Sequence, residues 1–142
     1  MSAFITTSDY NASIHTEILN AITRNDAVVL ELAEDQAISE MRGYMHDRYD
    51  IDAIFNTTGT NRNMVVFMFA IDITLYHLHS AHNPMHFPQI RKDRYDRAME
   101  WLSQLQRSVI SPDLPLRVDS DGNKGSATGM NLTSNTKRVN QY

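Results

Sequence analysis

Four of the six histidines fall between His77 and His86, which makes this stretch the first candidate for chemistry. On a helix, His79 and His82 are three residues apart and lie on one side, where two imidazoles can share a metal ion. No acidic residue between Asp72 and Asp93 completes a ligand set. We therefore expect structural or surface histidines near a helix end, where a positive charge also suits the helix dipole, and assign no metal ligand.

Acidic residues offer two further patterns. Asp119–Asn123 resembles the start of a calcium loop, but such a loop ends on a bidentate Glu, and no Glu follows Glu100. Neighbouring carboxylates such as Glu34 and Asp35 could do acid–base work. They have no nucleophile elbow, phosphate-binding glycine loop or cofactor motif around them. We expect a polar turn and a solvated helix face, with no catalytic residue and no cofactor.

Composition narrows the class of protein further. The 142 residues include no cysteine, which excludes disulfides, zinc–thiolate and iron–sulfur sites and thiol nucleophiles. This length favours one domain with a sizeable core. The longest apolar run, Met64–Ile71, is far shorter than the roughly 20 residues of a membrane-spanning helix. We therefore expect no membrane association.

The net charge of −4 averages two unlike parts. Residues 117–142 carry four cations and two carboxylates, hence +2, and the remainder of the chain carries −6. Gly, Ser, Asn and Thr dominate this C-terminal stretch, a composition that buries too little apolar surface to order itself. We predict a helical body over residues 1–115 and an extended tail over residues 116–142.

Hydrophobic periodicity predicts four helical stretches in the body. The first opens at Thr6 with a capping-box pattern and carries Ile14, Ile18 and Ile22 on one face, with a possible break before Ile14. The second covers about 26–48 and starts at the capping pair Asn25-Asp26, the third covers 61–81 and ends before Pro84, and the fourth covers 88–108. Residues 49–60 show no sustained period, so we expect a loop there that packs Ile51, Ile54 and Phe55 onto the body. With no alternating strand pattern, the predicted fold is all-α, a small bundle of about four helices.

The opposite face of the last helix alternates in sign between Arg91 and Glu100. Such a pattern is typical of a solvated helix face, and it also suits a seam between side-by-side copies in a ring. The cations Arg91, Arg94 and Arg97 are our candidates for partner binding in the body.

Several stretches together resemble a known family. The last predicted helix matches the pattern R-Y-x-x-A-x-x-W-L of the small connector proteins of Mu-like phages and prophages, in particular those of Bacteroidetes viruses. The resemblance covers about residues 4–115, and the stretches that carry it are Phe4-Ile5-Thr6, Gly43-Tyr44, Arg48-Tyr49, Leu75–His79, and Arg94, Tyr95, Ala98, Trp101 and Leu102.

The resemblance implies a structural role at the head–tail interface of a virion that is assembled in the bacterial cytoplasm. Such proteins stack as a ring below the portal and extend the channel for DNA, which passes without specific binding. Twelve copies are implied if the portal's symmetry is kept. Partners would be the portal protein and the next tail or connector ring. The acidic body agrees, because a channel that gripped phosphates would impede passage of DNA.

The tail suits capture of a neighbouring subunit or the portal by coupled folding. Its candidate anchors are two cations, an aromatic tip and two apolar residues, namely Lys137, Arg138, Tyr142, Met130 and Leu132. The alternative is a phage-encoded helical adaptor or regulator that binds nucleic acid or another protein. The absence of a basic recognition helix weighs against it.

Overall fold

The computed structural model describes residues 3–122. In this range the chain forms five α-helices and two short 3-10 helices, and the prediction of an all-α fold is confirmed. The β-pairing found among these residues is one isolated bridge, between Tyr49 and Leu116. Most of the predicted tail lies outside the described residues.

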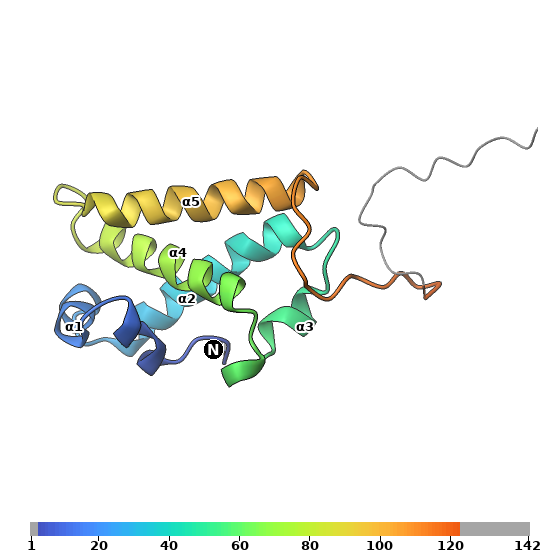
Figure 1. Cartoon of the computed structure of the whole chain (residues 1–142). Helices are drawn as coiled ribbons and strands as arrows, with labels where there is room; N and C mark the ends of the chain where they lie inside the picture. The colour runs from blue at the N-terminus through green and yellow to red at the C-terminus, as the bar shows by residue number, and fades with distance from the viewer. Residues whose placement is uncertain (1–2, 123–142) are drawn as a thin grey trace, which may run out of the picture.

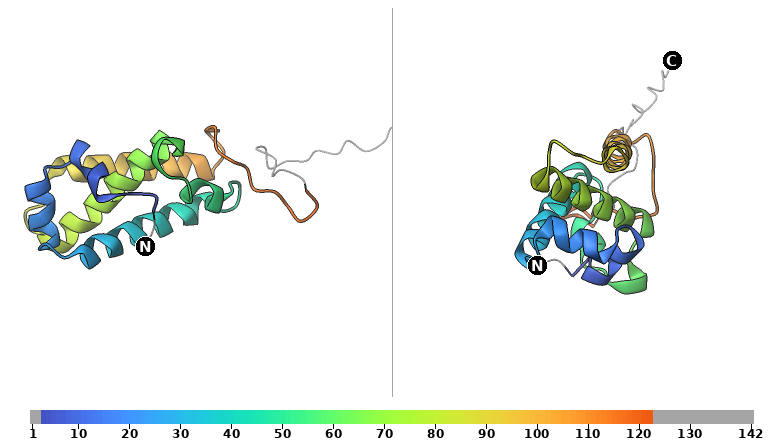
Figure 2. Two further views of the ribbon diagram at one scale, coloured as in Figure 1. Left: turned by 90° about the horizontal axis from the view of Figure 1, so that it is seen from below. Right: turned by 90° about the vertical axis from the view of Figure 1, so that its left-hand side faces the viewer.

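Three long helices form the bundle, and their bounds are close to those predicted. They are α2 (Ala27–Met45), α4 (Met64–His82) and α5 (Gln89–Gln106). Each packs against the other two, with α5 lying along α4 (Figures 1 and 2). Two predicted boundaries are observed: α2 begins after its cap Asp26, whose side chain accepts from the Val28 amide (2.9 Å), and α4 ends at its C-cap Asn83, before Pro84.

Helix α4 is the centre of the core. It is buried on most sides, from Val66 to Leu78, because it contacts α1, α2 and α5. By length and composition alone it is apolar enough to cross a membrane, and 56% of that stretch is buried inside the bundle. A core helix of a bundle has this character, since no face of it needs to be polar.

The first predicted helical stretch is two elements, a 3-10 helix (Thr7–Ala12) and α1 (Thr16–Thr23), with the break at Ser13–His15. The backbone N–H of Thr6 donates to Asp9 (2.8 Å), as the capping pattern predicts. The expected isoleucine face is only partly correct. Ile14 and Ile22 are buried, but Ile18 is 46% exposed, because α1 begins after the break and turns Leu19 inward instead.

The predicted loop at 49–60 was wrong in part. It contains α3 (Ile51–Phe55) and a 3-10 turn (Gly59–Asn61). Asp50 caps α3 by accepting from the Ala53 amide (3.0 Å), and Ile54 and Phe55 are buried on the body as expected. Five residues are too few to show a helical period in the sequence, so the capping residue was the available signal.

The chain leaves the bundle beside α3 rather than at the end of α5. Leu114 is buried, and two backbone hydrogen bonds of 2.9 Å flank the Tyr49–Leu116 bridge: Asp50 N–H to Pro115 O and Arg117 N–H to Arg48 O. Beyond this bridge, the exposed residues 118–122 lead away from the helices (Figure 1).

Candidate interaction surfaces

Two of the three candidate arginines of α5, Arg94 and Arg97, lie over a buried carboxylate of α4. Asp72 is 2% exposed, and its oxygens lie 3.7 Å from Arg94 Nη1 and from Arg97 Nη2. These distances exceed hydrogen-bond length, and Asp72 Oδ2 has no hydrogen-bond partner among the described residues. Burial raises the pKa of Asp72, and Arg94 and Arg97 oppose that rise.

The three arginines differ in how accessible their side chains are to a partner protein. Arg91 turns inward: its Nη2 donates to the carbonyl of Ser13 (2.7 Å), its Nη1 is buried without a partner, and burial lowers its pKa. The side chains of Arg94 and Arg97 are 41% and 59% exposed. Arg94 and Arg97 are therefore the two that a neighbour can reach, and Arg91 joins α5 to the N-terminal segment.

Apolar side chains extend this arginine surface along α4. Met64, Val65 and Met68 are exposed by 63%, 43% and 39%, respectively. Arg97 connects the two groups, because its Nη2 lies 3.7 Å from Met68 Sδ and its guanidinium lies over the ring of Phe69 (5.7 Å). A cationic, partly apolar surface of this kind resembles the rim and core of a protein interface.

Of the four clustered histidines, His77 joins two long helices and His79 bonds within α4, whereas His82 and His86 are exposed. His77 Nε2 donates to Glu40 Oε2 (3.1 Å), and the Tyr95 hydroxyl donates to Glu40 Oε1 (2.9 Å). His79 Nδ1 donates to the carbonyl of Leu75 (2.8 Å), and burial lowers its pKa. Within residues 3–122 no three His, Asp or Glu side chains are grouped so that they could hold a metal ion.

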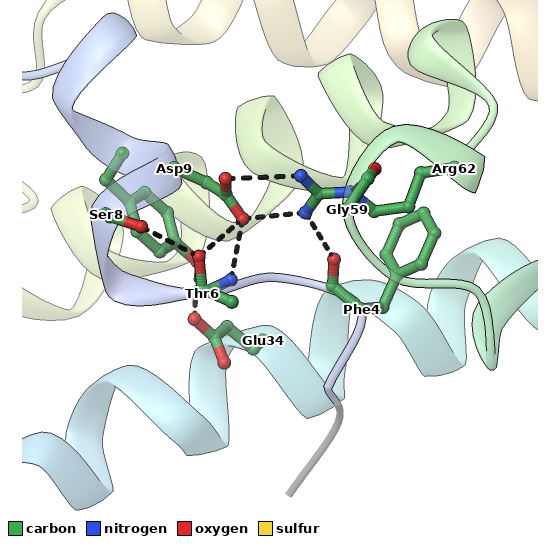
Figure 3. A network of polar contacts seen from close by, with 8 residues as sticks. Phe4, Thr6, Ser8, Asp9, Glu34, Gly59 and Arg62 are labelled. Atoms are coloured by element: carbon green, nitrogen blue, oxygen red, sulfur yellow. Dashed lines mark hydrogen bonds and ion pairs between the residues drawn. The ribbon is translucent and has the colours of Figure 1, made fainter.

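A second polar cluster fixes the N-terminal segment (Figure 3). Arg62 donates to both oxygens of Asp9 (2.7 and 3.3 Å) and to the carbonyl of Phe4 (2.8 Å), and it stacks over Phe67 at 4.1 Å. These donors lower the pKa of Asp9 to about 2. Beside it, the Tyr10 hydroxyl donates to buried Glu34 (2.8 Å), whose pKa is raised by burial.

The N-terminal segment and α2 together border two hollows that meet at Ala3. One, of about 440 Å³, is lined by Ile5, Leu30 and Glu34 among others. The other, of about 660 Å³, is lined by Asp35, Ser39 and residues of α3. Periodicity did not predict this surface, since the N-terminal segment reaches α2 only through the tertiary fold. The Glu34–Asp35 pair, expected on a solvated face, is divided: Glu34 is 6% exposed and Asp35 is exposed.

The tail candidates Met130, Leu132, Lys137, Arg138 and Tyr142 lie outside the described residues and stay predictions. Comparison with known proteins adds one match. A family model described as "Bacteriophage Mu, Gp36" matches residues 4–130, which is most of the chain and reaches beyond the described bundle. No curated protein and no solved structure matches.

Proposed function

Because the chain belongs to the bacteriophage Mu Gp36 family, we propose that it is a structural protein of the virion and a subunit of the ring that connects head and tail. Family membership over residues 4–130 is the observation that carries this proposal. The role is one of assembly, without catalysis, cofactor or membrane attachment. The ring, of twelve copies if it follows the portal, docks on the portal protein, binds the next tail or connector ring and extends the DNA channel.

The charge of the body supports this role. Residues 1–122 carry ten cations and seventeen carboxylates, hence a net −7. DNA binding relies on lysines and arginines that neutralise phosphates, so a strongly acidic body has weak affinity for a duplex. Such a body suits a conduit through which DNA must move, and it disfavours the alternative of a nucleic-acid-binding adaptor.

The surface of α4 and α5 supports contact with other subunits. Arg94, Arg97 and Met68 present charge beside exposed apolar area, which an acidic surface of a neighbouring copy complements. Subunits in a ring are joined head to tail, so each needs two different, mutually complementary surfaces. The basic α5 surface supplies one of these.

Assembly on portal-containing particles tests the proposal. We expect the purified chain to form rings, seen by native mass and negative-stain imaging, and to co-sediment with the particles. Arg94→Glu combined with Arg97→Glu is expected to lower docking or ring formation at least about tenfold. Arg107→Glu is the matched control, because this exposed arginine bonds only Ser103 of its own helix among the described residues.

Two outcomes would overturn the proposal. One is a chain that stays monomeric and fails to bind particles. The other is a monomer that binds DNA with a steep salt dependence, which supports the nucleic-acid-binding adaptor instead.

A further inference from the structure

One continuous surface follows α2 from its first turn to its last, and we term it the α2 groove. The helix residues lining its two hollows recur three and four residues apart, on one face of α2: Ala27, Leu30, Glu31, Glu34, Asp35, Ile38, Ser39 and Arg42. Ala3 lines both hollows, and the N-terminal segment borders the groove (Figure 3). The floor is apolar, since Ile5, Leu30 and Ile38 contribute to it.

The charge of the groove is negative and largely unpaired. Glu31 and Asp35 form no ion pair within residues 3–122, and the buried carboxylate of Glu34 has a hydroxyl, not a cation, as its partner. Among the residues that the structure describes, the one cation lining these hollows is Arg42, which is paired with Asp52 at 3.1 Å. The groove therefore offers apolar area and two unpaired carboxylates, Glu31 and Asp35, to a cationic occupant.

The chain itself supplies a sequence with the opposite character. Residues 123–142 contain three cations, Lys124, Lys137 and Arg138, and no Asp or Glu. Near the end, two adjacent cations, Lys137 and Arg138, precede two apolar residues that are three positions apart, Val139 and Tyr142. In a polyproline II conformation, which repeats every three residues, these two apolar side chains lie on one side of the peptide, and the cations flank them.

The lengths also match. From Ala27 to Arg42 the groove spans fifteen helical steps, about 22 Å at 1.5 Å per residue. An extended segment of about seven residues covers that distance, and residues 136–142 are seven residues that hold Lys137, Arg138, Val139 and Tyr142. The thirteen residues between 123 and 135 can reach up to about 45 Å, enough to cross from one subunit to another.

We propose that the α2 groove binds residues 136–142 of a second copy of this chain. A second copy is favoured over the same chain because residues 118–122 lead away from the bundle (Figures 1 and 2). Lys137 and Arg138 pair with Glu31 and Asp35, while Val139 and Tyr142 occupy the apolar hollows. The inference rests on the proposed function only in requiring neighbouring copies, and it names the groove that receives each tail.

The absence of cysteine allows a direct test in the full-length chain. One variant carries Ser39→Cys in the groove, and a second, of different mass, carries Asn140→Cys. After the two variants are mixed and oxidised, we expect a disulfide-linked heterodimer, because residues 136–142 of one copy lie in the α2 groove of the other. Gln106→Cys replaces Ser39→Cys in the control, because Gln106 is exposed at the far end of α5. Equal heterodimer yields with Ser39→Cys and with Gln106→Cys would refute the proposal. So would a disulfide that forms only within one chain carrying both Ser39→Cys and Asn140→Cys.

Charge reversal provides the second arm. Glu31→Lys with Asp35→Lys, or Lys137→Glu with Arg138→Glu, is expected to lower the heterodimer yield at least about tenfold, and combining both pairs is expected to restore it. No loss, or loss without restoration, would overturn the pairing. If portal docking persists while cross-linking fails, this inference alone is refuted. If the unsubstituted chain never docks, the proposed function is refuted.

Discussion

Asp72 on α4 faces Arg94 on α5 across 3.7 Å, and the two charges are paired without a hydrogen bond. The carboxylate is 2% exposed, whereas the arginine side chain remains 41% exposed. Removing a carboxylate from water costs several kcal/mol, and attraction at this distance offsets only part of that cost. Asp72 therefore lowers the stability of the bundle, while its charge holds two partly exposed arginines on the surface.

Replacing Asp72 by a neutral isostere is expected to stabilise the fold. Asp72→Asn removes the buried charge with little change in shape, so we predict a gain of about 1 kcal/mol in the free energy of unfolding near pH 7. Urea denaturation followed by circular dichroism measures it. Asp96→Asn, in the exposed pair with Lys92, is the control and should change stability by less than about 1 kcal/mol. A marked loss of stability in Asp72→Asn would contradict the prediction.

The effect of Asp72 has a defined sign with pH. Its pKa is raised in the folded state, so its burial penalty acts above the folded pKa and disappears as the pH falls below the unfolded value near 3.8. The stability gain of Asp72→Asn should therefore be largest at neutral pH and shrink toward pH 3. A gain that is constant across pH 3–7 would show that packing, not charge, is responsible.

Arg62 is expected to be the most costly arginine to remove. Its side chain is 11% exposed, and its loss removes the Arg62 hydrogen bonds to both oxygens of Asp9 and to the Phe4 carbonyl. Arg62→Met preserves much of the stem over Phe67, and we predict a loss of about 3–5 kcal/mol in urea denaturation. Arg62→Lys should recover less than half of this lost stability, because an ammonium cannot reproduce the two hydrogen bonds that the guanidinium makes to the carboxylate. Arg42→Met, at an exposed pair, should cost less than about 1 kcal/mol.

Acid should destabilise the fold through Asp9. Its folded pKa of about 2 lies below the ordinary value of 3.8, so it contributes stability above pH 3.8 that is lost as the pH falls toward 2. The difference in stability between the unsubstituted chain and Asp9→Asn, measured between pH 5 and 2, should narrow over this window. A difference that does not change with pH would contradict the assigned role of the carboxylate.

Tyr10→Phe tests the buried hydroxyl–carboxylate pair. The buried Glu34 carboxyl would lose its 2.8 Å donor, so we predict a loss of about 1–3 kcal/mol in the free energy of unfolding and a further rise in the pKa of Glu34. Denaturation measures the first effect, and NMR titration of the Glu34 carboxyl measures the second. Glu34→Gln retains an acceptor for Tyr10 without the charge and should cost less than Tyr10→Phe.

The sequence predicted the fold best where local chemistry decides it. Asp26 and Pro84 mark helix ends in the sequence, and the structure follows both, because capping and the geometry before proline act over a few residues. Ile18 was misplaced because the buried face of α1 is formed by Leu19, Ile22 and Thr23, which leaves Ile18 at its edge. Helix α3 was missed because its five residues make fewer than two helical turns, too few for a pattern to repeat.

The candidate surfaces were predicted only in part. The arginines of α5 stood out by their spacing, but Asp72, the common partner of Arg94 and Arg97, lies 22 and 25 residues before them on another helix. In the sequence, Asp72 is a single acid that follows an apolar run, and this contrast was the available signal. The α2 groove depends on the N-terminal segment crossing a helix from elsewhere in the chain, which no local pattern encodes.

The small bridge between Tyr49 and Leu116 sets where the molecule bears mechanical load. Tension applied to the C-terminal segment reaches the bundle first through the two 2.9 Å backbone hydrogen bonds beside this bridge, and so passes to the junction of α2 and α3. The end of α5 carries little of this load, because residues 115–117, which lie between α5 and the pulled segment, are already bonded to the bundle. Force on this segment therefore passes to α2 and α3, while the central helix and its core stay undisturbed.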